Sequence, residues 1–205
     1  MSSELLARLS GRLIVSCQDY TEVMVKAALR GGAGGLRINS PRDVRATRRL
    51  TRLPILGCNK MWLPNSPIYI TPSVRAAAAL LRAGADLVAL DCTPRPRVRQ
   101  QPAEIIAAIH AAGGLAVADL SCVAEAAAAV RAGADVLATT LAADFDVEFV
   151  RALTGFGLPV LAEGHIDTPD AARRALDAGA WAVCVGSAIT RPHLLTEQFK
   201  NALKT

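Results

Sequence analysis

One lysine and two carboxylates in this chain lie at or just after the ends of short apolar runs. Lys60 follows Ile55–Cys58, whereas Asp119 and Glu163 each end a run of their own. A lysine withdrawn from water can lose its proton and act as a base, which an arginine cannot do. Because most cations of the chain are arginines, we interpret Lys60, Glu163 and Asp119 as catalytic residues. A Schiff-base role or a structural ion pair are the alternatives for Lys60.

Three further polar residues, Gln18, Arg37 and Asp91, are predicted to bind a substrate. Each lies within or directly after another short apolar run. Arg37 could instead pair with a neighbouring carboxylate, and Asp91 could accept hydrogen bonds from the loop that begins at Thr93.

Glycines at the ends of two late apolar runs predict a phosphate site. Gly164 follows Glu163, and Gly186 and Ser187 follow the run Ala182–Val185. Parallel strands that end in this way place bare backbone N–H groups side by side, as the last two loops of a β/α barrel do around a phosphate. Arg191 follows closely enough to add a charge-assisted contact.

An internal repeat predicts the elements that position these residues. Ala83–Asp86, Ala132–Asp135 and Ala178–Trp181 each follow an alanine-rich helical pattern, and each leads at once into an apolar run. The glycine in each unit is expected to end the helix in the left-handed conformation. Asn65–Pro72 is expected to be a loop that leads into a helix beginning at Thr71.

The apolar runs are continuous rather than alternating, which indicates strands buried on both faces of a parallel sheet. They predict an α/β fold, a single-domain (β/α)8 TIM barrel of the phosphate-binding type over residues 1–205. A doubly wound sheet fits less well, because Gln18 rather than a GxGxxG motif follows the first strand. The predicted strands are Leu13–Cys17, Gly35–Ile38, Ile55–Cys58, Leu87–Asp91, Leu115–Asp119, Val136–Thr139, Val160–Glu163 and Ala182–Val185.

Composition excludes several classes of protein. A hydrophobic content of 52% excludes a disordered chain, and no apolar run is long enough to span a membrane. The net charge of +5 comes from scattered arginines without an aromatic stacking platform, so we expect an anionic small substrate and no nucleic acid. The five cysteines lack metal-site spacing and are expected to be reduced core residues, which predicts no metal. Because the chain has neither a membrane span nor a signal-peptide core in Met1–Arg12, a cytoplasmic protein is expected.

Taken together, the motifs resemble N-acetylmannosamine-6-phosphate 2-epimerase of bacterial sialic-acid catabolism, over nearly the whole chain. The resemblance implies interconversion of N-acetylmannosamine 6-phosphate and N-acetylglucosamine 6-phosphate without an organic cofactor. It places the catalytic lysine at Lys60, the assisting carboxylates at Glu163 and Asp119, and substrate contacts at Gln18, Arg37 and Arg191. The motifs are Ile14–Gln18, Gly35–Asn39, Leu53–Gly57 with Lys60, Ile68–Pro72, Val88–Asp91, Ala118–Ser121, Thr139–Leu141, Ala162–Gly164 and Val185–Pro192.

The expected partner is a phosphorylated N-acetyl amino sugar, and a homodimer is one candidate assembly. The proton on C2 of such a sugar is α to a carbonyl in the open-chain aldehyde, so Lys60 as a free amine could remove it. Two alternatives remain: a Schiff-base aldolase or lyase, and a sugar-phosphate-binding barrel without catalysis.

Overall fold

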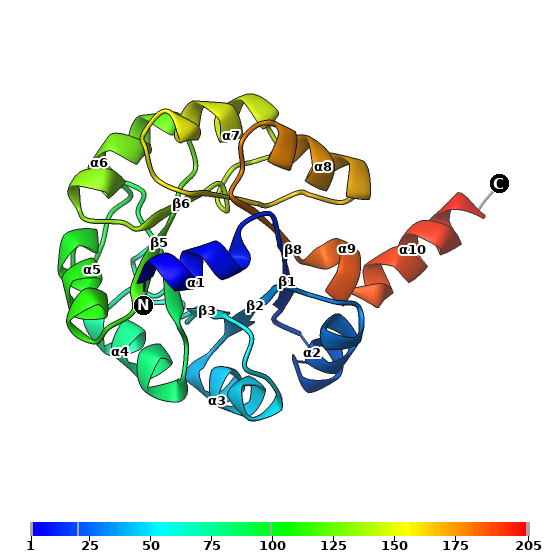
Figure 1. The fold of residues 1–205 in the computed structure, drawn as a ribbon, viewed down its shortest axis with the longest axis horizontal. Coiled ribbons are helices and arrows are strands. Elements are labelled where there is room, and N and C mark those ends of the chain that lie inside the picture. The colour runs from blue at the N-terminus through cyan, green and yellow to red at the C-terminus, as the bar shows by residue number, and fades with distance from the viewer. Residues whose placement is uncertain (1, 20, 99, 204–205) are drawn as a thin grey trace.

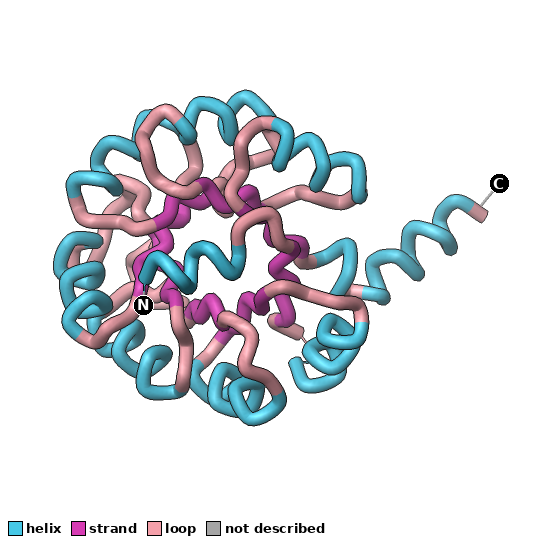
Figure 2. Tube along the Cα trace, in the orientation of Figure 1, coloured by secondary structure: helices cyan, strands magenta, loops and turns pink. Residues whose placement is uncertain are grey.

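The computed structural model describes residues 2–19, 21–98 and 100–203. Eight parallel strands follow one another around a closed barrel, and the first strand pairs with both the second and the eighth. Figure 2 shows this ring of strands enclosed by an outer ring of helices. The predicted (β/α)8 TIM barrel is therefore confirmed.

The strands occupy almost the predicted residues, because each is a run of side chains that the barrel buries on both faces. Six of the eight have the predicted bounds, the second is one residue longer, and the sixth is one residue shorter. The strands are β1 (Leu13–Cys17), β2 (Gly35–Asn39), β3 (Ile55–Cys58), β4 (Leu87–Asp91), β5 (Leu115–Asp119), β6 (Val136–Ala138), β7 (Val160–Glu163) and β8 (Ala182–Val185).

The helices form the outer layer, and Figure 1 labels them in chain order. Glycine ends the repeat helices as expected; Gly84, for example, has φ 105° and donates its N–H to carbonyls of the preceding turn. The helices are α1 (Ser2–Leu9), α2 (Thr21–Arg30), α3 (Pro41–Leu50), α4 (Val74–Ala83), α5 (Pro102–Ala111), α6 (Ala126–Arg131) after the 3-10 turn Val123–Glu125, α7 (Val147–Thr154), α8 (Pro169–Asp177), α9 (Ser187–Thr190) and α10 (Pro192–Ala202).

The prediction that a helix begins at Thr71 is wrong. Helix α4 begins at Val74, and the hydroxyl of Ser73 caps it by accepting the N–H of Ala76 at 3.2 Å. Part of the predicted loop is also paired, since Ile70 forms an antiparallel bridge with Lys60. The segment before α4 is therefore attached to the end of β3.

Two apolar layers hold the barrel together, one inside the strands and one between the strands and the outer helices. Helix α1 lies across the N-terminal end of the barrel (Figure 1), where Leu9 is buried and the Trp181 indole N–H donates to the Leu6 carbonyl at 2.9 Å. This closure leaves the carboxyl ends of the strands as the open end of the barrel.

Four cysteines are buried as predicted, whereas Cys122 is exposed because it lies in the loop after β5, and all five are free thiols. Helix α10 extends away from the barrel (Figure 1), and none of its residues is buried. No helix in the described part of the chain is long and apolar enough to cross a membrane.

Candidate active site

A cleft of about 580 Å³ opens at the carboxyl ends of the strands. Because parallel strands bring their carboxyl ends to one face of a barrel, residues far apart in the sequence meet there. All the predicted site residues except Asp91 and Asp119 line this cleft: Gln18, Arg37, Lys60, Glu163, Gly164, Gly186, Ser187 and Arg191.

Arg37 on β2 occupies the centre of the site and is almost completely buried. It pairs with Asp119 through two hydrogen bonds of 2.7 and 3.3 Å and donates a further hydrogen bond to Glu163. Burial acts against its charge, but the two carboxylates outweigh burial and raise the pKa of the guanidinium. Arg37 is therefore a fixed cation, and its buried Nε has no hydrogen-bond partner among the described residues.

Glu163 ends β7, with its carboxylate between Arg37 and the cleft. Burial raises the pKa of its carboxyl group more than the charge of Arg37 lowers it, and Asp119 adds to the rise. Its backbone is fixed by Thr139, whose hydroxyl donates to the Glu163 carbonyl at 2.8 Å and accepts the Glu163 N–H at 3.0 Å. A carboxyl group held in this way can carry a proton at the cleft wall.

Asp119 does not line the cleft, although it was predicted to be catalytic. Its side chain is fully buried at the end of β5 and accepts hydrogen bonds from Arg37 and, at 2.7 Å, from the Thr140 hydroxyl. This arrangement places Asp119 behind Arg37, where it fixes the guanidinium and adds negative charge beside Glu163.

Asp91 is also removed from the cleft and engaged by its own loop. Its carboxylate accepts the N–H and hydroxyl of Thr93 at 2.9 and 2.7 Å and pairs with Arg95. These contacts correspond to the alternative expected from sequence, a hydrogen bond to the Thr93 loop, and leave no observed contact of Asp91 with the cleft.

Lys60 lies just beyond β3, with its side chain lining the cleft. Its backbone N–H donates to the side-chain carbonyl of Asn39 at 2.9 Å, and its backbone pairs with Ile70. Within the ranges that the structure describes, no carboxylate forms a salt bridge with its amino group. The alternative of a structural ion pair for Lys60 is therefore not observed there.

The predicted phosphate loops lie side by side after β7 and β8, which are paired strands. Gly164 has φ 97°, in the left-handed region that favours glycine. Gly186 precedes the short helix α9, whose first N–H groups have no partner within the helix. Arg191 reaches the same loops and pairs with Asp19 at 2.9 Å.

Several cleft residues were not predicted from sequence. Tyr69 lines the cleft, and its ring stacks on that of Trp62 at a centroid distance of 5.6 Å. Thr140 lines it too and bridges Asp119 and Glu163. The sequence signals for Thr140 are its place after β6 and in the motif Thr139–Leu141, and Tyr69 has only its place in the motif Ile68–Pro72. The fold of residues 59–71 brings Tyr69 back to the strand ends.

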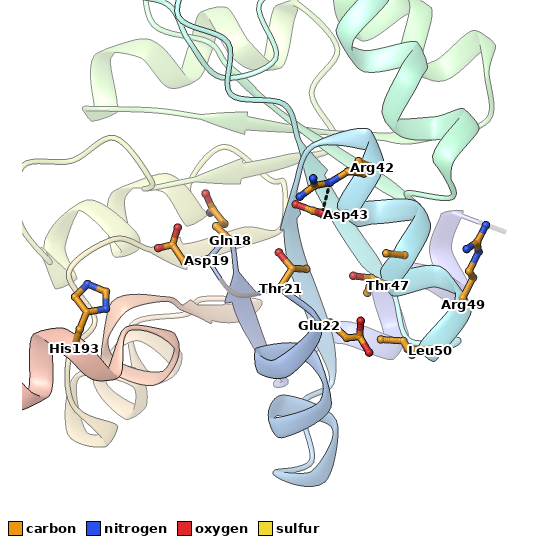
Figure 3. A pocket seen from close by; sticks show the side chains of 11 residues that line it. Gln18, Asp19, Thr21, Glu22, Arg42, Asp43, Thr47, Arg49, Leu50 and His193 are labelled. Atoms are coloured by element: carbon orange, nitrogen blue, oxygen red, sulfur yellow. Dashed lines mark hydrogen bonds and ion pairs between the residues drawn. The ribbon is translucent and has the colours of Figure 1, made fainter.

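A second hollow, of about 900 Å³, lies on the outside of the barrel between α2 and α3. Figure 3 shows the residues that line it, including Gln18 and Asp19 near its end and the paired Arg42 and Asp43. None of the three predicted catalytic side chains belongs to the described lining. The cleft at the strand ends is therefore the candidate active site.

Comparisons with known proteins agree with this assignment. A family model described as "Putative N-acetylmannosamine-6-phosphate epimerase" matches residues 21–205. The solved structure of N-acetylmannosamine-6-phosphate 2-epimerase from Clostridium perfringens is similar, with a TM-score of 0.93 and 35% identity, over 97% of this chain and 96% of that one. Thiamine phosphate pyrophosphorylase from Pyrococcus furiosus, at 22% identity and a TM-score of 0.63, shares the fold.

A longer relative is the bifunctional enzyme NanE/NanK of Brucella suis, which is 40% identical over 224 residues. That match covers all of this chain but only 42% of the relative, so the chain spans less than half of its length. The family model covers most of the chain, and the Clostridium structure matches nearly all of it. This chain belongs to the N-acetylmannosamine-6-phosphate epimerase family.

Proposed function

We propose that this protein interconverts N-acetylmannosamine 6-phosphate and N-acetylglucosamine 6-phosphate. One observation carries the proposal: Lys60 and Glu163 line the same cleft as the paired glycine loops and Arg191. Proton-transfer groups and an anion-binding end thus share one space large enough for a sugar phosphate. The family match and the similarity to the Clostridium enzyme support the same reaction.

The chemistry we infer is removal and return of the proton at C2. In the open-chain sugar, Lys60 as a free amine takes this proton, and the electrons of the C–H bond form an enolate with the C1 carbonyl. Return of a proton to the opposite face of C2, from Lys60 or from Glu163, gives the epimer. Arg37 is a preorganised cation that can stabilise the negative oxygen of the enolate.

The phosphate is the anchor in this proposal. Backbone N–H groups of Gly164, Gly186 and Ser187, together with the Arg191 side chain, hold it at the β7 and β8 end of the cleft. Because the phosphate lies at C6, far from C2, its binding energy orients the reacting carbon without taking part in the reaction. We assign further substrate contacts to Gln18 and Arg37.

A Schiff-base aldolase or lyase is the second candidate, because the Lys60 amine lines the cleft without a salt bridge among the described residues. Borohydride separates the two chemistries, since it reduces an imine to a stable amine. Incubation with substrate and borohydride, followed by mass spectrometry, should leave the protein mass unchanged. An adduct on Lys60 would favour the lyase.

We also propose that the protein forms a homodimer through α10. The helix extends away from the barrel (Figure 1), and three apolar residues recur every four residues along it: Leu195, which also lines the cleft, Phe199, and Leu203 directly after the helix. This spacing places them on one face, and Phe199 and Leu203 are 73% and 81% exposed. Pairing with a second copy would bury two such stripes in one symmetric contact.

A further inference from the structure

We propose that Thr71 is a positioning residue that holds the strand end carrying Lys60. This inference rests on the proposed function, because its effect is on the base of that reaction. Thr71 does not line the cleft and touches no reacting group. It acts through the backbone of Asn59, the residue directly before Lys60.

The backbone of Thr71 has an unusual conformation. Its φ of 45° lies in the left-handed region, and its side chain is completely buried. A β-branched residue is rare in this region, which glycine occupies without steric cost. Backbones held in sparsely populated conformations cluster at functional sites. The threonine side chain must therefore contribute something that the favoured glycine lacks.

That contribution is a hydroxyl group inserted between two strands. Thr71 Oγ1 accepts the N–H of Asn59 at 3.1 Å and donates to the carbonyl of Ala89 on β4 at 2.6 Å. The Thr71 N–H in turn donates to the Asn59 carbonyl at 2.9 Å. Thr71 thus binds both backbone groups of Asn59, the residue directly before Lys60.

The sheet itself does not provide this support. The pairing between β3 and β4 consists of Leu56 with Leu87 and Gly57 with Val88, and it ends before Asn59. Beyond that point the hydroxyl of Thr71 occupies the place of a direct bond between Asn59 and Ala89. The Thr71 hydroxyl thus links the chain after β3 to β4 beyond the last direct pair of the two strands.

The other bonds around Lys60 complete the frame. The Lys60 backbone N–H donates to the side-chain carbonyl of Asn39, which ends β2. Ile70, the neighbour of Thr71, forms a backbone bridge with Lys60. The backbone at Lys60 is consequently tied to β2 through Asn39 and to β4 through the Thr71 hydroxyl, and the Ile70 carbonyl, which accepts the Asp91 N–H at 3.2 Å, is a further link to β4. Loss of the Thr71 hydroxyl should let the Lys60 amine move relative to C2 of the sugar, while the phosphate loops on β7 and β8 stay in place.

Two substitutions separate the hydroxyl from the backbone strain. Thr71→Ser keeps the hydroxyl, whereas Thr71→Gly removes it and suits the left-handed backbone. Steady-state epimerisation should show kcat of Thr71→Ser within about threefold of wild type and kcat of Thr71→Gly lowered at least about tenfold, because small displacements of a catalytic group are costly. KM for the sugar phosphate should change less than kcat in both variants. Thr47→Ala is the control, since Thr47 is a buried threonine on α3 whose hydroxyl has no partner among the described residues.

The outcomes distinguish this inference from the proposed function. An inactive wild type would contradict the proposed function, and this inference with it. If wild type is active, two results would overturn the role of the Thr71 hydroxyl and leave the proposed function standing. One is a Thr71→Gly variant with full kcat, and the other is a Thr71→Ser variant as impaired as Thr71→Gly. If Thr71→Gly fails to fold, as judged by circular dichroism, Thr71→Ala replaces it with the same expected loss of kcat, and full activity of that variant would equally overturn the inference.

Discussion

At the scale of single residues, the site depends on unequal charges around Arg37. One guanidinium faces two carboxylates, and the carboxylate on the cleft side belongs to Glu163. Burial raises the pKa of the Glu163 carboxyl group, the charge of Arg37 offsets only part of this rise, and the nearby carboxylate of Asp119 adds to it. This arrangement keeps Arg37 charged and lets Glu163 take up a proton.

The raised pKa of Glu163 predicts a pH dependence of stability. The folded protein binds the Glu163 proton more tightly than the unfolded chain, so this group lowers the free energy of unfolding as the pH rises above the ordinary range of a glutamate. Glu163→Gln lacks this penalty. Thermal melts over a pH series should show the Gln variant gaining on wild type with rising pH. A difference in melting temperature that stays constant with pH would contradict the raised pKa.

Arg191 tests the phosphate site. Arg191→Ala removes a charge-assisted hydrogen bond of about 1.5–3 kcal/mol, so KM for N-acetylmannosamine 6-phosphate should rise at least about tenfold. Its present partner Asp19 is half-exposed, so leaving that carboxylate unpaired costs little. Turnover of unphosphorylated N-acetylmannosamine should hardly change.

Arg173→Ala is the matched control, because Arg173 is an exposed arginine on α8 that pairs with Asp177. An equal loss for both sugars in Arg191→Ala would place the phosphate elsewhere, and the loop with Arg95 would be the next candidate.

At the scale of elements, α1 is the part of the fold that closes the end of the barrel opposite the site. The Trp181 indole N–H donates to the Leu6 carbonyl of this helix. Trp181→Phe keeps an aromatic ring but loses that bond, which should cost about 1 kcal/mol, or roughly 2–4 °C in melting temperature. The kcat should remain unchanged, as the cleft lies at the other end. A loss of kcat without a loss of stability would contradict this separation.

The sequence predicts the helices and strands well because the residues that determine them are close together in the chain. Continuous apolar runs and helix-ending glycines are visible in short windows, and they locate all eight strands. Partners of buried polar groups are not local: Asp119 meets Arg37 across 82 residues, and only barrel closure decides that it lies behind the guanidinium. The start of α4 was misplaced for a related reason, since Thr71 is held by Asn59 after β3 and by Ala89 within β4 rather than by a helical turn.

At the scale of the whole molecule, α10 makes the proposed homodimer testable. Phe199→Asp places a charge in the exposed apolar stripe, and light scattering should show a dimer for wild type and a monomer for the variant. Lys200→Glu is the control, because Lys200 is a neighbouring polar residue on the same helix and this variant should stay dimeric. A monomeric wild type, or a dimeric Phe199→Asp variant, would contradict an interface through α10.

The central claim is that Lys60 moves the C2 proton of a 2-acetamido sugar phosphate, and proton NMR tests it most directly. N-acetylmannosamine 6-phosphate is incubated in D₂O with wild type and with Lys60→Ala, and both sugars are followed. We expect wild type to form N-acetylglucosamine 6-phosphate with deuterium at C2, and Lys60→Ala to form essentially none. A Lys60→Ala variant active within about tenfold of wild type, or roughly 1.4 kcal/mol of barrier, would contradict the claim.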